Sequence, residues 1–292
     1  LFDGAMSHAK VYVNGQEVGY WPYGYNSFYF DITKQLMPGK KNTLAVRLEN
    51  LPESSRWYPG AGLYRNVHVI VTENAYIPVW GTYITTPTAT KEFAKVNVQT
   101  KIVLPEGADA SKYSVKTSVW NPNGQKLTEQ TIPLSQIKYN DNSLSQEFII
   151  QTPTLWSPDM PALYSAETRL YEGDQLKDIY TTPFGIRSIE IIPNKGFFLN
   201  GEKTVFKGVC NHHDLGPLGA AVNDAAIRRQ IRILKDMGCN AIRTSHNMPA
   251  PELVRACDEM GMMLMVESFD EWNKAKCANG YNLIFDEWVE KD

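Results

Sequence analysis

Three segments of this 292-residue sequence follow short apolar runs with polar and titratable side chains. The first, NHHD at residues 211–214, holds two histidines, and the second, RTSHN at residues 243–247, holds an arginine and another histidine. The third, ESFDEWN at residues 267–273, holds carboxylates and a tryptophan. Because histidines and carboxylates transfer protons, bind metals and hydrogen-bond hydroxyl groups, these segments form the candidate functional region.

A zinc site built from His212, Asp214 and His246 is one interpretation of these residues. Their spacing matches no compact zinc motif, however, and carboxylates are not concentrated beside the histidines. Neutral imidazoles that exchange hydrogen bonds with ligand hydroxyl groups are the simpler interpretation. We therefore expect no metal site and no cofactor.

Arg243 lies within an apolar strand-like run, where an unpaired cation is costly to bury. It should face a carboxylate, either Glu267 on the neighbouring run or one from a strand outside this sequence. Glu267 and Glu271 also suggest an acid and nucleophile pair for glycosidic bond cleavage. The segment leaves a strand, so their spacing of four does not place them on one helix face, and this pairing is not expected.

The segments around these residues alternate between strand and helix patterns. Continuous apolar runs at residues 204–209, 240–244 and 262–266 are typical of buried parallel strands. Apolar residues recur at helical spacing over residues 223–237 and 251–260. Such units fit the start of a TIM barrel or a doubly wound sheet, and they bring the three polar segments to one sheet edge.

Before residue 185 short alternating runs are separated by Gly, Pro, Asn and Asp, and Asn14-Gly15 is a strong hairpin signal. We expect an antiparallel sandwich or jelly roll, then a linker strand at residues 74–90, then an immunoglobulin-like sandwich. The expected strands are residues 10–13, 17–20, 27–32, 42–48 and 65–71 in the first region, and 94–99, 114–120, 147–150 and 162–171 in the second.

The composition limits the class of protein. A net charge of −3 gives no reason to expect nucleic acid as a partner, and no apolar run approaches the length of a membrane span. The four cysteines form no C-x-x-C pair, so we expect free thiols. No signal peptide is visible, which leaves a periplasmic, secreted or cytoplasmic location open, and a homo-oligomer is compatible with the sequence.

Several motifs resemble glycoside hydrolase family 2, in the order in which that family has them. They match the end of its sugar-binding jelly roll, the end of its immunoglobulin-like domain and the first strands of its catalytic barrel. The motifs are RWYPGAGLYR at residues 56–65, LWSP at 155–158, FGIR at 184–187, GFFLNG at 196–201, KGVCNHHD at 207–214 and NAIRTSH at 240–246.

The resemblance implies a multidomain β plus α/β chain. Its parts would be the C-terminal part of a jelly-roll sugar-binding domain at residues 1–75, an immunoglobulin-like β-sandwich at residues 76–186, and the start of a (β/α)8 TIM barrel at residues 187–292. The implied activity is retaining, exo-acting hydrolysis of terminal β-galactosides or related β-glycosides, with a carbohydrate as the partner.

The resemblance also implies residue roles. His212 and His246 match histidines that hold the sugar, and Arg243 matches an arginine that orients the nucleophilic carboxylate. The remaining substrate-binding candidates are Asn211, Asp214 and Trp272. The family's acid/base and nucleophile glutamates follow its fourth and seventh barrel strands, so we expect no catalytic residue within this sequence and no activity from it alone.

Several places depart from the family pattern, among them Asn211-His212-His213, where many galactosidases have Arg-His-Glu. Arg56 lies where some members place an acidic residue that touches the sugar, and Asn273 lies where a magnesium-binding histidine would be expected near Glu271. A divalent or monovalent cation is therefore doubtful.

The alternatives are a related β-glucuronidase or β-mannosidase, or a carbohydrate-binding module without catalysis that uses Trp21, Tyr23 and Tyr25. A structural adhesin of tandem sandwiches does not explain the strand and helix alternation after residue 185.

Overall fold

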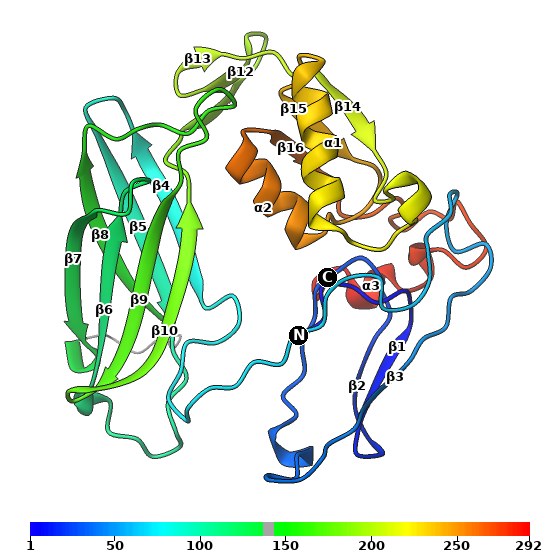
Figure 1. Cartoon of the computed structure of the whole chain (residues 1–292), viewed down its shortest axis with the longest axis horizontal. Coiled ribbons are helices and arrows are strands. Elements are labelled where there is room, and N and C mark those ends of the chain that lie inside the picture. Colours follow the sequence, from blue (N-terminus) through cyan, green and yellow to red (C-terminus); the bar gives the residue numbers. More distant parts are fainter. Residues whose placement is uncertain (137–142) are drawn as a thin grey trace. The chain divides into compact units, whose positions relative to one another are not determined.

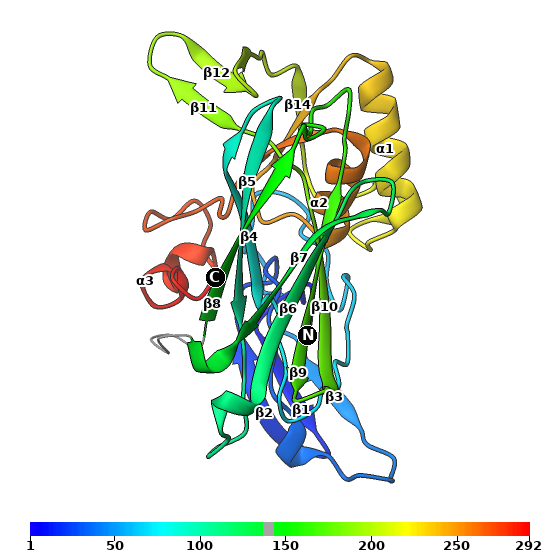
Figure 2. The ribbon, with the colours of Figure 1, turned by 90° about the vertical axis from the view of Figure 1, so that its left-hand side faces the viewer.

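The chain forms two compact units, described here from a computed structural model that covers residues 1–136 and 143–292. One unit combines residues 1–70 with residues 206–292, and the other comprises residues 71–205 (Figures 1 and 2). This division groups the first and last parts of the chain, so the three domain ranges expected from the sequence stay a prediction. Within the described residues, no helix combines the length and apolar character that a membrane span requires.

The unit of residues 71–205 contains the expected immunoglobulin-like sandwich. One antiparallel sheet has the strand order β10-β9-β6-β7 and the other has the order β4-β5-β8 (Figure 1). The sequence pattern missed β7 and β10, whose exposed faces weaken their alternation. The strands are β4 (Thr82–Ala89), β5 (Phe93–Lys101), β6 (Tyr113–Trp120), β7 (Lys126–Pro133), β8 (Ser143–Gln151), β9 (Tyr164–Glu172) and β10 (Gln175–Phe184).

The sandwich core comes from alternate residues that point inward from both sheets. Val96 and Phe148 from one sheet pack with Val119 from the other. A buried polar contact crosses the same core, because the Thr117 hydroxyl donates to Gln146 Oε1 at 2.6 Å. Burial of these polar groups is tolerated because they satisfy each other.

A small antiparallel sheet follows the sandwich within the same unit. Its strands are β11 (Ile189–Ile192), β12 (Gly196–Leu199) and β13 (Glu202–Lys203). Asn200 ties it to the sandwich by donating to the Trp156 carbonyl at 3.0 Å. The motif at residues 196–201, expected at the barrel entry, therefore packs with the sandwich unit.

The other unit begins with a three-stranded antiparallel sheet in the order β2-β1-β3. Its strands are β1 (Ala9–Val13), β2 (Gln16–Trp21) and β3 (Leu44–Arg47). Asn14 and Gly15 both adopt positive φ, at 51° and 83°, as the tight turn of a hairpin requires. The hairpin predicted from Asn14-Gly15 is confirmed.

The prediction of two further strands in this region was wrong. Residues 27–32 and 65–71 form no continuous ladder, and Phe28 and Val67 each make only an isolated bridge to Phe2. Val69 is 73% exposed, although its apolar character suggested a buried strand. An apolar run becomes a strand only where a neighbouring strand pairs with it, and the described residues provide no further partner here.

The parallel βα pattern is confirmed in the second half of this unit. The strands β14 (Gly208–Asn211), β15 (Ala241–Thr244) and β16 (Met263–Val266) pair in parallel in chain order. Helices α1 (Asp224–Asp236) and α2 (Pro251–Met260) connect them and lie side by side in Figure 2. The first strand begins four residues later than expected, because only residues from Gly208 onward pair with β15.

The two helices begin and end where the sequence indicates. Asn223 caps α1 by accepting a hydrogen bond from the Ala226 amide at 3.0 Å, and Gly261 ends α2 in the left-handed conformation at φ 73°. Ile231 of α1 is fully buried against Ile242 of β15 in the core beneath the sheet. This packing fixes the position of the strand ends relative to the helices.

The remaining helical segments are short. They are α3 (Phe285–Trp288) and the 3₁₀ turns η1 (Thr33–Gln35), η2 (Ala110–Lys112), η3 (Leu134–Gln136), η4 (Gly216–Leu218) and η5 (Tyr281–Leu283).

Arg65 joins the β region to the βα region inside this unit. Arg65 is 4% exposed, and its guanidinium donates to the carbonyls of Tyr25 at 2.6 Å and Met248 at 2.8 Å. Tyr23 adds a hydrogen bond from its hydroxyl to the Ser268 carbonyl at 2.8 Å. These contacts hold the loop before Arg65 next to the ends of the barrel strands.

Candidate active site

The three polar segments meet at one edge of the parallel sheet, as the sequence predicts. Asn211, Thr244 and Val266 are partners across the three strands, so the residues that follow them leave the sheet together. His212 therefore lies near His246, with ring centroids 5.6 Å apart and planes at 88°.

Glu267 connects Arg243 and His246. It accepts hydrogen bonds from Arg243 Nε and from His246 Nδ1, the latter at 2.8 Å. The expectation that Arg243 faces a carboxylate is confirmed, and the partner is Glu267. Since Nδ1 donates to a carboxylate, the neutral imidazole of His246 keeps Nε2 as a free acceptor for a ligand.

Arg243 is a permanent cation in this arrangement. Its Nη1 group also donates to the Cys210 sulfur at 3.4 Å. The hydrogen bonds to Cys210 and Glu267 raise the pKa of its guanidinium above the usual value. Arg243 therefore offers fixed positive charge at the strand ends at any physiological pH.

Trp57 comes from the β region and completes an aromatic corner with His212 and His246. Its ring centroid lies 5.2 Å from that of His212 and 5.7 Å from that of His246. The indole nitrogen donates to the Tyr25 hydroxyl at 3.2 Å, which holds the ring in place. Such a corner can cover the apolar face of a ring-shaped ligand while the imidazole nitrogens hydrogen-bond its hydroxyl groups.

A cavity of about 450 Å³ lies beside this corner. That volume is in the range of small-molecule sites. Most of the side chains that line the cavity are polar or aromatic. Its lining residues are Arg56, Arg243, His246, Val266, Glu267, Ser268, Phe269, Asp270, Trp272 and Lys276.

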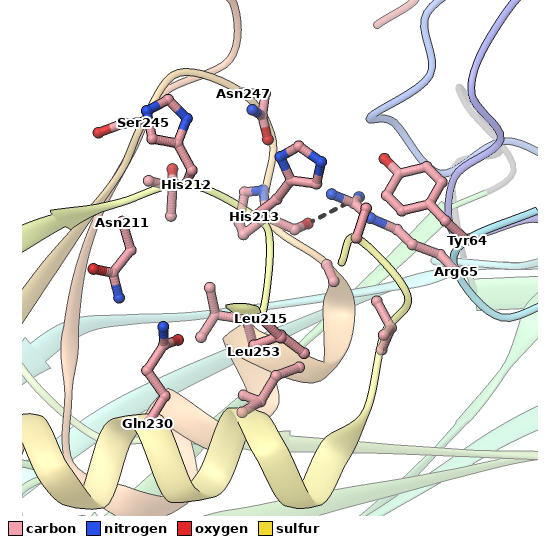
Figure 3. Close-up of a pocket in the computed structure, with 16 residues that line it drawn as sticks. Tyr64, Arg65, Asn211, His212, His213, Leu215, Gln230, Ser245, Asn247 and Leu253 are labelled. Carbon is pink, nitrogen blue, oxygen red and sulfur yellow. Dashed lines mark hydrogen bonds between the residues drawn. The ribbon is translucent and has the colours of Figure 1, made fainter. Parts of the chain in front are cut away.

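A second, smaller cavity of about 30 Å³ lies below the histidines (Figure 3). His212 and His213 reach it from the segment after β14, and Ser245 and Asn247 from the segment after β15. His213 donates from Nε2 to the Pro59 carbonyl at 2.8 Å. Burial lowers the pKa of His213, so this ring is a neutral, structural histidine and not an acid.

The structure distributes the predicted site residues over three places. His212, His246 and Arg243 come together around Glu267 and Trp57. Trp272 lines the larger cavity and is 65% exposed, and Asn211 lines the smaller one. Asp214 is exposed and lines neither cavity, so its role stays a prediction.

Glu267 and Glu271 are the carboxylates that the sequence offers as a catalytic pair. Among the described residues, no group of three or more His, Cys, Asp or Glu side chains is arranged to hold a metal ion. Glu271 is 3% exposed, accepts from the Lys276 amide at 2.9 Å and lies against Gly280, away from the lining of the larger cavity. Glu267 and Glu271 therefore do not line the larger cavity together.

The aromatic residues considered as an exposed sugar platform are packed inside the unit. Tyr23 and Tyr25 are 8% and 6% exposed, and Trp21 stacks on Phe28 with ring centroids 5.4 Å apart. That use of Trp21, Tyr23 and Tyr25 was wrong, because these rings bury apolar surface between the β region and the C-terminal segment. All four cysteines are free thiols, as expected.

Sequence reasoning missed Trp57 and the ion pair between Arg56 and Asp270 as parts of the site. Arg56 Nε donates to Asp270 Oδ2 at 3.1 Å, although 214 residues separate the two. Two signals pointed to this loop: the motif at residues 56–65, and the family's acidic, sugar-touching residue near the position of Arg56. Neither signal indicated which residues the loop contacts.

Comparison with known proteins identifies the family. A model described as glycosyl hydrolases family 2 matches residues 76–187, and the model for the TIM barrel domain of the same family matches residues 190–287. All four cysteines, His212, Arg243 and His246 lie in the range of the second model.

The relatives and solved structures agree with these matches. The chain is 42% identical to "Beta-galactosidase BoGH2A" of Bacteroides ovatus over all of its own length and 34% of the relative's. It is 37% identical to a "Putative beta-glucuronidase" of Formosa agariphila, over all of this chain and 27% of the relative. A crystal structure of a glycosyl hydrolase family 2 member from Bacteroides cellulosilyticus superimposes with a TM-score of 0.91 at 35% identity, covering all of this chain and 37% of the other. The chain spans about a third of the length of the curated relatives it matches, and it belongs to glycosyl hydrolase family 2.

Proposed function

We propose that this chain supplies the sugar-holding wall of a retaining β-glycosidase that acts on terminal β-galactosides or related β-glycosides. The observation that carries the proposal is the aromatic corner of Trp57, His212 and His246 beside Glu267, at the ends of three parallel barrel strands. In a barrel of this type the chemistry takes place at that end.

In this proposal the chain's residues bind and orient the substrate. The sugar ring lies against Trp57, and His246 Nε2 accepts a hydrogen bond from a hydroxyl group. Glu267 keeps the imidazole in that tautomer. Arg243 provides positive charge that would orient a further carboxylate of the whole enzyme.

Retaining hydrolysis needs two carboxyl groups about 5–5.5 Å apart, one to protonate the leaving oxygen and one to form the glycosyl-enzyme. Glu267 is engaged by Arg243 and His246, and Glu271 is buried away from the larger cavity. Neither is placed as a free nucleophile within the described residues. We therefore propose that the catalytic pair is supplied by barrel strands beyond the three that this chain contains.

Three measurements test the proposal. The purified 292-residue chain should bind methyl β-D-galactoside, detected by shifts of its indole N–H resonances, but should not release nitrophenol from a nitrophenyl β-galactoside. In the whole enzyme, His246→Ala should lower kcat/KM by at least a hundredfold with an unchanged Tm. Turnover by the chain alone, or near-normal activity of the variant, would contradict these assignments.

The β-glucuronidase alternative is tested by the same assay with matched nitrophenyl substrates. We expect the galactoside to be the better substrate, because the chain is 42% identical to a β-galactosidase of Bacteroides ovatus. A preference for the glucuronide would assign the enzyme to the other group of relatives.

A further inference from the structure

The two chain neighbours of His246 line a different cavity from His246 itself. Ser245 and Asn247 line the smaller cavity of about 30 Å³, whereas His246 lines the larger one. The segment after β15 therefore has side chains in both cavities, and Figure 3 shows the side that faces the smaller one. Whatever holds Ser245 and Asn247 in place also holds the imidazole between them.

Several polar atoms of the residues that line the smaller cavity are buried and have no hydrogen-bond partner among the described residues. They are Ser245 Oγ, Asn247 Nδ2, His213 Nδ1 and Arg65 Nε. Ser245, Asn247 and Arg65 are 3%, 2% and 4% exposed, so bulk solvent does not reach these atoms. Buried polar groups in folded proteins are nearly always paired. Their gathering around one cavity therefore indicates a ligand that pairs them.

The hydrogen-bonding character of these atoms decides what the ligand can be. Asn247 Nδ2 and Arg65 Nε are donors only, so they need an acceptor. His213 donates from Nε2 to the Pro59 carbonyl at 2.8 Å, so Nδ1 of the neutral ring is an acceptor and needs a donor. An anion would pair only with the two donors, and a cation only with His213. A water molecule can accept from the donors and donate to the imidazole.

The size of the smaller cavity agrees with water. A buried water needs roughly 10–15 Å³ of such space and two to four polar partners. The volume of about 30 Å³ therefore holds one or two water molecules. Apolar side chains form another part of the lining, among them Leu215, Ile227 and Leu253 (Figure 3). The polar partners are thus confined to the part of the wall that Asn247, His213 and their neighbours supply.

We propose that the smaller cavity binds an ordered water that accepts a hydrogen bond from Asn247 Nδ2 and donates one to His213 Nδ1. The water joins the segment after β15 to the segment after β14, and Asn247 is a positioning residue that acts on His246 through it. Water-mediated hydrogen bonds are enthalpically nearly as good as direct ones. The positioning role rests on the proposed function, because it assumes that His246 holds the sugar, whereas the water site does not.

A crystal structure of the 292-residue chain, at a resolution that shows ordered water, tests the site directly. We expect a density peak within hydrogen-bond distance of both Asn247 Nδ2 and His213 Nδ1. Crystals soaked in sodium bromide distinguish water from an anion, because bromide gives an anomalous signal. Absence of a peak between the two atoms, or an anomalous peak at that place, would overturn the proposal.

Two substitutions of Asn247 separate the effect of the water from that of packing. Asn247→Leu keeps the branched shape but removes the donor, whereas Asn247→Ala leaves space that a further water can fill. We expect Asn247→Leu to raise the Kd of methyl β-D-galactoside about tenfold, or about 1.4 kcal/mol, and Asn247→Ala to raise it about twofold. Asn123→Leu, in an exposed turn of the other compact unit, is the matched control and should leave the Kd unchanged.

The outcomes separate this inference from the proposed function. If Asn247 serves packing alone, the order of the two variants reverses, because Ala leaves a cavity and Leu does not, and the positioning role is overturned. If the folded chain binds no sugar, the proposed function and the positioning role both fail, while the density between Asn247 and His213 still decides the water site. The crystal of the unmodified chain also keeps the test valid if Asn247→Leu fails to fold.

Discussion

His246 donates from Nδ1 to Glu267 at 2.8 Å, and the same carboxylate accepts from Arg243 Nε. The Glu267 carboxylate therefore sets both the tautomer of His246 and the position of Arg243. Neither residue's function is independent of Glu267, which the sequence offers only as one possible partner for Arg243.

Replacing Glu267 by Gln should release both partners. The amide keeps the shape of the side chain but loses its charge, and a hydrogen bond to a charged group contributes about 1.5–3 kcal/mol. We expect activity of the whole enzyme to fall about tenfold or more. In the 292-residue chain, nitrogen NMR of His246 should show a larger fraction of the Nε2–H tautomer in Glu267→Gln than in the unmodified sequence. An unchanged tautomer would show that Glu267 does not orient the ring.

Trp57→Ala should weaken sugar binding without unfolding the chain. The ring lies against both His212 and His246, and an aromatic contact is worth about 0.5–1.5 kcal/mol beyond buried area. We therefore expect a Kd for methyl β-D-galactoside about threefold to tenfold higher. Trp80→Ala is the matched control, because that ring is 54% exposed in the other compact unit. Equal effects of the two substitutions would remove Trp57 from the site.

Arg65→Met should destabilise the unit that contains residues 1–70 and 206–292. The buried guanidinium satisfies carbonyls of Tyr25 and Met248, and its loss leaves them unpaired. Each buried unpaired group costs about 1–3 kcal/mol, so we expect the free energy of unfolding in urea to fall by about 3 kcal/mol. Arg47→Gln, at an exposed ion pair, should change it by less than about 0.5 kcal/mol.

His213 should make this unit less stable in mild acid. Burial lowers its pKa, while the hydrogen bond to Pro59 opposes the shift, and Arg65, Asp214 and His212 are the charged or titratable neighbours. Because the folded-state pKa lies below the unfolded value of about 6.5, the unfolded chain binds the proton first. The free energy of unfolding should therefore fall as the pH drops below 6.5, by at most about 1.4 kcal/mol per pH unit, and level off below the folded-state pKa.

Thermal unfolding between pH 7.5 and 5 measures this dependence. His213→Gln should flatten the part of the slope that His213 contributes. His8→Gln is a useful comparison, since burial also lowers the pKa of His8 and its contribution should be separate. An identical slope in His213→Gln and the unmodified chain would contradict the assignment.

The βα half of the chain could be predicted closely from its sequence because its signals are local. Asn223 and Gly261 mark helix ends, and the apolar spacing along α1 matches the buried face that includes Ile231. The strand ends then followed from the parallel arrangement, which places His212 and His246 together.

The rest of the site depends on contacts that no local pattern records. Residues 27–32 have the composition of a strand but lack a neighbour to pair with continuously. Trp57 and Arg56 lie in an irregular loop, and their partners His246 and Asp270 follow about two hundred residues later. Only tertiary packing through buried groups such as Arg65 brings them together.

The loop that carries Arg56 and Trp57 has a consequence for chimeric enzymes. Trp57 contacts His246, Arg56 bonds to Asp270, and Arg65 bonds to Met248, so the loop and the ends of the barrel strands form one contact surface. Exchanging only the barrel between family members would transfer only some of the residues that line the proposed site. A functional recombinant would need a crossover that carries residues 54–66 along with the barrel to which they are fitted.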